Sequence, residues 1–134
     1  MKGRYIIFAD DDEDDLELIT GHFKEYDRNV NVLEFKDGQE VIRFLDDFAI
    51  KTSPPVLIVL DVNMPRMNGK ETLIAIRQHP HFKNIPVIIY TTSYSREDQD
   101  FCQENNATWV HKPNHINDVK NIAKIIADFC NQSI

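Results

Sequence analysis

The sequence predicts an α/β fold in which five parallel strands form a single sheet and helices cover both of its faces. Apolar segments of strand length alternate along the chain with segments whose apolar residues recur at helical spacing. Alternation of this kind calls for a parallel sheet with right-handed crossovers, because each helix returns the chain to the start of the next strand. At 134 residues the chain is long enough for one domain with its own core.

The predicted strands are residues 5–9 (YIIFA), 30–35 (VNVLEF), 56–60 (VLIVL), 87–90 (VIIY) and 108–111 (TWVH). The first, third and fourth consist almost entirely of Ile, Val, Leu and aromatic residues, which is typical of strands buried on both faces. The second and fifth mix polar with apolar residues, so we expect them at the edges of the sheet.

A helix is predicted after each strand. Apolar residues recur at helical spacing at Leu16, Ile19 and Phe23, at Val41, Leu45 and Phe48, at Leu73 and Ile76, and at Ile116, Val119, Ile122, Ala123 and Ile126. The segment YSREDQDFCQENNA is long enough for a helix but polar, and only Phe101 and Cys102 are expected to anchor it. Residues 46–56 contain two prolines and are expected to form a loop.

Composition limits the partners that the chain can have. The formal net charge of -7 argues against nonspecific binding to nucleic acid or to anionic membranes, but not against a basic protein partner. No apolar run approaches the roughly 18 residues of a membrane span. Cys102 and Cys130 lack metal-site spacing and are expected to be reduced thiols. We therefore expect one cytoplasmic domain over residues 1–134, without an output domain.

Polar residues stand directly after the predicted strands. Asp10 and Asp11 follow the first, Asp61 follows the third, and the fourth and fifth are followed by Thr91 with Thr92 and by Lys112 with Pro113. The carboxyl ends of parallel strands lie at one edge of the sheet, where ligands of such folds bind. We therefore expect three carboxylates, a hydroxyl and an ammonium group in one pocket.

This set of groups suits phosphoryl transfer assisted by Mg²⁺. Clustered carboxylates need a cation if they are to remain ionised together, and hard oxygen ligands favour Mg²⁺. A carboxylate beside the ion can attack phosphorus and form an aspartyl phosphate. An ammonium, a hydroxyl and backbone N–H groups can then neutralise the charge on the phosphoryl oxygens.

The acidic run at residues 10–15 has two explanations. Glu13, Asp14 and Asp15 fall in the first turn of a predicted helix, where negative charge is favourable, and Asp12 is either a further functional acid or the helix cap. Taken alone, such a run is usually a solvated helix start. The 1-3-5 spacing of a calcium loop also occurs here, but Asp15 stands where that loop requires glycine.

The ordered segments ADDD, LDVNMPRMNG, TTS and WVHKP together resemble the receiver domain of two-component response regulators. The resemblance covers the whole chain and implies a flavodoxin-like (βα)₅ fold with strand order 2-1-3-4-5. It implies that Asp61 is the phosphoacceptor. It also implies that Mg²⁺ is bound by Asp10, Asp11, Asp61 and the backbone carbonyl of Asn63.

The resemblance assigns further roles near the phosphoryl group. Thr91 is the hydroxyl that follows the phosphoryl group when the switch closes, and Lys112 pairs with its oxygens. The peptide bond before Pro113 is expected to be cis. Trp109 departs from the family, since it stands where Tyr or Phe usually acts as a switch residue, and Thr92 stands where Ala or Gly is frequent.

The resemblance implies a signalling switch rather than an enzyme with an external substrate. A sensor histidine kinase supplies the phosphoryl group to Asp61, and the domain catalyses its own phosphorylation and slow dephosphorylation. The altered surface, formed by the fourth helix, fifth strand and fifth helix, then docks to a downstream protein. In the alternative, the domain is a phosphorelay intermediate that passes the group to a histidine phosphotransfer protein. The overall pattern is similar to stand-alone receivers that pair with bacterial phytochrome kinases.

Two other classes of protein also use this architecture. A phosphohydrolase of the haloacid dehalogenase type places its nucleophilic aspartate in a DxDx[TV] pattern after the first strand, but here Asp14 occupies the Thr/Val position. A flavodoxin-like electron carrier needs a phosphate-binding loop after that strand, and an acidic run would repel the phosphate. Phosphorylation by acetyl phosphate, with and without Mg²⁺, separates the three classes.

Overall fold

The computed structural model of the protein describes residues 3–115 and 118–132. Its elements alternate along the chain in the order β1 (Arg4–Ala9), α1 (Glu13–Tyr26), β2 (Val30–Phe35), α2 (Gly38–Asp47), η1 (Ala49–Lys51), β3 (Leu57–Leu60), α3 (Gly69–Gln78), β4 (Val87–Thr91), α4 (Arg96–Glu104), β5 (Ala107–His111) and α5 (Val119–Gln132). The predicted strands therefore all form, with bounds that differ by at most one residue at each end.

The strands form one parallel sheet in the order β2-β1-β3-β4-β5, so the predicted fold and strand order are confirmed. The three central strands are buried along most or all of their length, whereas β2 and β5 lie at the edges and are only partly buried. The continuous apolar runs of β1, β3 and β4 follow from this position, since both faces of each strand are covered.

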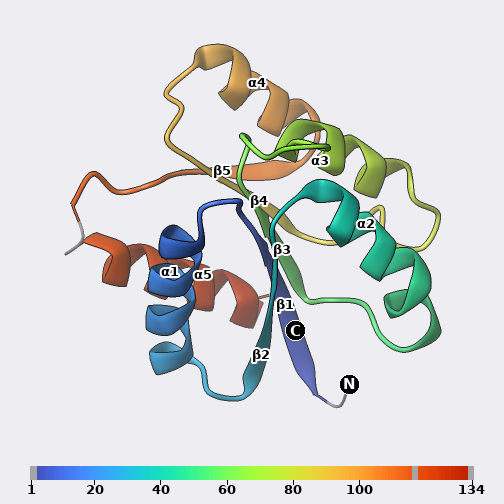
Figure 1. Ribbon diagram of the computed structural model, residues 1–134, viewed down its shortest axis with the longest axis horizontal. Coiled ribbons are helices and arrows are strands. Elements are labelled where there is room, and N and C mark those ends of the chain that lie inside the picture. The colour runs from blue at the N-terminus through green and yellow to red at the C-terminus, as the bar shows by residue number, and fades with distance from the viewer. Residues whose placement is uncertain (1–2, 116–117, 133–134) are drawn as a thin grey trace.

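Helices α1 and α5 lie together on one face of the sheet, and α2, α3 and α4 lie on the other (Figure 1). Leu16, Ile19 and Phe23 of α1 pack with Ala123 and Ile126 of α5 in one core. The second core contains residues of α2 and α3 but only Cys102 as a fully buried residue of α4. Among the described helices α1 to α5, α4 therefore contributes the fewest buried apolar residues to the cores, in line with its polar sequence.

Helix caps determine how the chain leaves two of the central strands. Asp12 is the N-cap of α1, and its side chain accepts hydrogen bonds from the backbone N–H groups of Asp14 and Asp15. After β3, Asn68 and Glu71 form a reciprocal capping box at the start of α3. Such caps stabilise a helix by about 0.5–2 kcal/mol. The acidic start of α1 thus begins the helix directly after Asp10 and Asp11.

Some details differ from the prediction. Residues 46–56 contain the end of α2 and the short helix η1, and Phe48 follows α2 as a partly exposed residue. Helix α4 is shorter than the polar segment because Ser95 caps its start and the chain turns at Asn106, which has a φ of 55°. Ile116, expected in the last helical stripe, lies outside the described residues.

The prediction of a cis bond before Pro113 is wrong, because no peptide bond within the described residues is cis. The trans isomer of an X–Pro bond is the intrinsically favoured one, by roughly 0.5–1 kcal/mol. Lys112 reaches the carboxylates of the sheet edge with the bond in the trans form. In the part of the chain that the structure describes, no helix has both the length and the apolar character needed to cross a membrane.

Candidate functional site

The predicted carboxylates meet at the carboxyl edge of the sheet. Asp10 and Asp11 follow β1, Asp61 follows β3, and one carboxylate oxygen of each lies within 4.8 Å of the others. Asp10 and Asp61 are buried, while Asp11 is exposed to solvent. The adjacency of β1 and β3 in the sheet, with Ala9 opposite Leu60, brings these distant parts of the sequence together.

Lys112, which follows β5, extends into this group of acids. Its ammonium nitrogen lies 2.6 Å from Oδ2 of Asp10, 3.3 Å from Oδ2 of Asp61 and 3.1 Å from Oδ2 of Asp15. Lys112 is only 7% exposed. Sequence reasoning assigned Asp15 to the first turn of α1 and missed its contact with the lysine, although its position five residues after Asp10 on a helix start was a usable signal.

The backbone holds the acidic groups in place. The carboxylate of Asp10 accepts the N–H of Asp12 at 3.0 Å, and that of Asp61 accepts the N–H of Asn63 at 3.5 Å. Gly69 lets the start of α3 pass close behind Asp61, since a Cβ at this position would lie 2.1 Å from the Asp61 carbonyl oxygen. A larger residue at position 69 would therefore displace the loop after β3.

Burial changes the acidity of these groups. Burial raises the pKa of Asp61 to about 6, the charge of Lys112 opposes this rise, and the neighbouring Asp10 adds to it. For Lys112 burial acts to lower the pKa, but the hydrogen bond to Asp10 and the charge of Asp61 outweigh it, so the pKa is raised. The lysine is therefore a permanent cation beside two carboxylates that repel each other.

The three carboxylates fit a divalent cation. They offer oxygen ligands from two adjacent loops, and the exposed Asp11 leaves one side open to solvent. Mg²⁺ prefers oxygen ligands and keeps several of its own waters, so a site with few protein ligands and an open side suits it. A bound cation would also oppose the burial and the repulsion by Asp10 that raise the pKa of Asp61.

Thr91 lies at the end of β4 with its side chain fully buried. Its hydroxyl oxygen accepts the backbone N–H of Ser93 at 3.2 Å, and its carbonyl accepts the N–H of Lys112 at 2.7 Å. Thr92 is exposed and lines a groove with Lys112 and Pro113. The hydroxyl is therefore engaged with the β4–α4 loop, residues 92–95, and not with Asp61.

Trp109 does not lie opposite Thr91 in the sheet. It pairs with Ile89, while Thr91 pairs with His111. The indole is partly buried, and its ring centroid lies 6.3 Å from that of Tyr94 in the β4–α4 loop. The indole N–H is buried and has no hydrogen-bond partner among the described residues. Tyr94 thus connects the β4–α4 loop to the indole.

The fold and this site define a class: a parallel α/β protein whose sheet edge holds a carboxylate cluster that fits a divalent metal, together with a buried lysine that pairs with these acids. The chain belongs to the response regulator receiver domain family, whose sequence model matches residues 6–124. Members of this family are phosphorylation-activated switches of two-component signalling.

Individual relatives agree with this assignment. Response regulator Rcp1 of Synechocystis sp. is 33% identical over 97 residues, which cover 71% of this chain and 66% of that protein. The crystal structure of the phosphorylated cyanobacterial phytochrome response regulator RcpA is similar with a TM-score of 0.89 and 26% identity, over 99% of this chain and 97% of that one. The Mn²⁺-bound form of Rcp1 has a TM-score of 0.86 and 28% identity, over 98% and 96% of the two chains.

Proposed function

We propose that the carboxylate of Asp61 accepts a phosphoryl group from a phosphohistidine of a sensor histidine kinase, in a reaction that requires Mg²⁺. A carboxylate oxygen of Asp61 attacks phosphorus, the P–N bond to the histidine breaks, and its electron pair stays on the imidazole nitrogen. The observation that carries the proposal is the position of the Lys112 ammonium 3.3 Å from the Asp61 carboxylate, beside Asp10 and Asp11.

The chain would hold Mg²⁺ through Asp10, Asp11, Asp61 and the backbone carbonyl of Asn63. The ion would supply positive charge for the phosphoryl oxygens. Lys112 is already in place to neutralise a further oxygen. The domain thereby catalyses its own phosphorylation and slow dephosphorylation, and it needs no external substrate beyond the donor.

The switch then follows from Thr91. Its hydroxyl can donate to a phosphoryl oxygen only if the side chain turns toward Asp61, and this movement would release the N–H of Ser93. The β4–α4 loop would become free to move, and α4 has little apolar contact to resist it. We propose that α4, β5 and α5 form the surface that a downstream protein recognises, or that a phosphotransfer protein uses in a relay.

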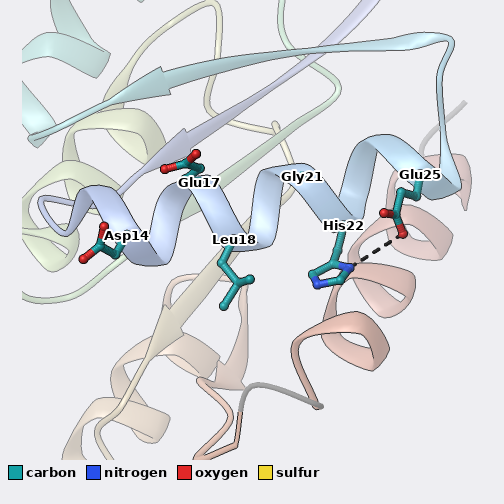
Figure 2. A pocket seen from close by; sticks show the side chains of 6 residues that line it. All are labelled: Asp14, Glu17, Leu18, Gly21, His22 and Glu25. Atoms are coloured by element: carbon teal, nitrogen blue, oxygen red, sulfur yellow. Dashed lines mark ion pairs between the residues drawn. The ribbon is translucent and has the colours of Figure 1, made fainter.

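The partner kinase would dock along α1. A groove on this helix is lined by Asp14, Glu17, Leu18, Gly21, His22 and Glu25 (Figure 2). Leu18 also lines the groove that contains Lys112 and Pro113, so the two grooves adjoin at this residue, on the side of the site where Lys112 enters. The acidic lining favours a partner with basic residues beside its histidine.

The relatives suggest which kinase this is. RcpA is a cyanobacterial phytochrome response regulator, so we propose a sensor kinase of the phytochrome type as the phosphoryl donor. We also propose a cytoplasmic location, which agrees with the two free cysteines, Cys102 and Cys130. The single-domain organisation over residues 1–134 is part of the same proposal.

The phosphoacceptor is tested by Asp61→Asn, which keeps the size of the side chain and removes the nucleophile. We expect wild-type protein to form one acid-stable, base-labile acyl phosphate with acetyl phosphate and Mg²⁺, measured by intact-protein mass spectrometry. The variant should form none. Wild-type protein with EDTA is the control for the metal. Stoichiometric labelling of Asp61→Asn would move the acceptor to another carboxylate.

A further inference from the structure

The turn between β2 and α2, residues 35–38, contacts both loops that carry the proposed metal ligands. The carbonyl of Phe35 accepts the backbone N–H of Asp10 at 3.0 Å, and the N–H of Gly38 donates to the carbonyl of Met67 at 3.0 Å. Gly38 permits the second contact, because a Cβ there would lie 2.7 Å from the Met67 oxygen and 1.8 Å from Oγ1 of Thr72. This turn therefore joins the loop after β1 to the loop after β3.

Asp37, in the same turn, forms an ion pair with Arg66 of the loop after β3. One oxygen of the carboxylate accepts hydrogen bonds from Nε of Arg66, at 2.8 Å, and from Nη2. The other oxygen accepts the N–H of Glu40 at 2.9 Å and caps α2. Asp37 is only 1% exposed, so both of its oxygens are used away from water. Neither residue is among the groups that the proposed reaction uses.

Arg66 has an unusual backbone conformation. Its φ of 63° lies in the left-handed region, which among the described non-glycine residues only Arg66 and Asn106 adopt. Asparagine tolerates this region, whereas arginine does so rarely. Such a conformation persists where surrounding contacts hold it, and it is concentrated at functional sites. Two contacts hold it here, three residues after Asn63: the ion pair with Asp37, and the hydrogen bond that the N–H of Met67 donates to the carbonyl of Pro65 at 2.6 Å.

We propose that Asp37 and Arg66 are positioning residues for the metal site. Their ion pair holds the β3–α3 loop, residues 61–68, so that the Asp61 carboxylate and the Asn63 carbonyl can bind one Mg²⁺ together. This inference rests on the proposed function of the same site. The pair acts through the backbone of the loop, because neither side chain belongs to the carboxylate cluster.

The test measures Mg²⁺ affinity of the full chain by isothermal titration calorimetry for Asp37→Asn, Arg66→Asn and the double variant. Asparagine at position 37 can still cap α2, and asparagine at position 66 tolerates the left-handed conformation. We expect each single variant to bind Mg²⁺ about tenfold more weakly, the lower end of the effect of losing a residue that orients a metal ligand. The double variant should bind no more weakly than either single one, because both remove one interaction.

The two single changes have opposite effects on charge, which separates positioning from electrostatics. If only long-range charge mattered, Asp37→Asn would bind Mg²⁺ more weakly than wild type and Arg66→Asn would bind it more tightly. That pair of results would overturn the proposal. Asp46→Asn is the matched control, since it removes a carboxylate of α2 that pairs with His79, away from the loop. Its Mg²⁺ affinity should equal that of wild type.

The outcomes also distinguish this inference from the function on which it rests. If wild-type protein neither binds Mg²⁺ nor accepts a phosphoryl group, the proposed function fails. If wild-type protein does both, and Asp37→Asn and Arg66→Asn bind Mg²⁺ within twofold of it, only the positioning role fails. If circular dichroism shows that Asp37→Asn does not fold, Arg66→Lys is tested in its place. Lysine keeps the positive charge but lacks the two guanidinium nitrogens that donate to Asp37.

Discussion

At the scale of single residues, the site contains an electrostatic conflict, which is the repulsion between two buried carboxylates. Asp10 and Asp61 are buried side by side, and within residues 3–115 and 118–132 Lys112 is the one cation that pairs with both of them. Burial raises the pKa of Asp61 to about 6 in the metal-free protein. Because the buried carboxylates destabilise the folded protein when no cation is bound, binding a cation or neutralising Asp61 should stabilise it. The same conflict makes the stability of the metal-free protein depend on pH.

The sign of this dependence follows from linkage. The folded protein holds the Asp61 proton more tightly than the unfolded chain, whose ordinary carboxyl pKa is 3.8. Stability is therefore lost as pH rises from about 4 to about 6, by up to about 3 kcal/mol for this residue. In EDTA, Asp61→Asn should lack this loss and be more stable than wild type above pH 6, but not at pH 4.

Urea unfolding at pH 4, 5, 6 and 7 measures this effect. Asp100→Asn, which removes an exposed carboxylate of α4, controls for the change in net charge. If wild type and Asp61→Asn lost the same stability over this range, the pH-dependent loss would come from another carboxyl group and not from Asp61. Added Mg²⁺ should stabilise wild type above pH 6 by binding only to the folded state.

At the scale of elements, the β4–α4 loop links the site to α4. Ser93 donates its N–H to Thr91 and its hydroxyl to Asp98, and Asp98 also forms an ion pair with Lys70 at the start of α3. Tyr94 of the same loop contacts Trp109 of β5. A movement of Thr91 can therefore reach the indole through the loop, although the two residues are not opposite each other in the sheet.

We expect beryllofluoride with Mg²⁺ to change the fluorescence emission of Trp109, the only tryptophan. Thr91→Ala should reduce the change, since the variant cannot exchange its bond with Ser93 for one with the phosphoryl mimic. Each such hydrogen bond contributes about 1 kcal/mol, enough to shift a balanced equilibrium severalfold. The emission spectrum is recorded with and without the ligand.

Tyr94→Leu tests the route of the signal. This variant should bind beryllofluoride normally and show a smaller change in emission, because the contact between the loop and the indole is lost. If beryllofluoride binds, as calorimetry would show, but the wild-type spectrum does not change, Trp109 has no role in the switch. The signal would then reach α4 through the hydrogen bond between Ser93 of the loop and Asp98.

At the scale of the whole molecule, the sheet separates two surfaces. Helices α1 and α5 cover one face, and α2, α3 and α4 cover the other (Figure 1). The groove on α1 lies on the face that α1 shares with α5, whereas α4 lies on the far side of the sheet from α1. A phosphoryl donor on α1 and a downstream partner on α4 can thus contact opposite faces of one small domain, while α5 of the proposed downstream surface lies on the α1 face.

The α1 surface gives a prediction about donors of different size. Combined Asp14→Lys and Glu17→Lys should slow phosphotransfer from a phosphorylated phytochrome-type kinase by about tenfold, since charge complementarity governs the rate of encounter. Phosphorylation by acetyl phosphate should be unaffected, because this small donor needs no docking surface. Both rates are measured by separating phosphorylated from unphosphorylated protein on Phos-tag gels.

Asp47→Lys, on the other face of the sheet, is the control for a change of charge. The wild-type rate with the kinase should also fall as the salt concentration rises, while the rate with acetyl phosphate should not. Equal slowing with both donors would show that the double variant damages the site, and no slowing with either would remove α1 from the docking surface.

Much of the fold and of the candidate site could be predicted from the sequence because both depend on local patterns. The apolar runs of β1, β3 and β4 identify buried parallel strands, and in such a sheet any residue that follows a strand is carried to the same edge. For this reason Asp10, Asp11, Asp61 and Lys112 could be expected together before any contact was known.

Only the tertiary structure decided which distant side chains meet. The contact of Asp15 with Lys112, the ion pair of Asp37 with Arg66 and the pairing of Thr91 with His111 depend on strand register and on how helices and turns pack. The trans bond before Pro113 and the raised pKa of Asp61 are likewise set by surroundings. Local periodicity carries no information on these, because register, burial and packing arise only when separate segments of the chain come together.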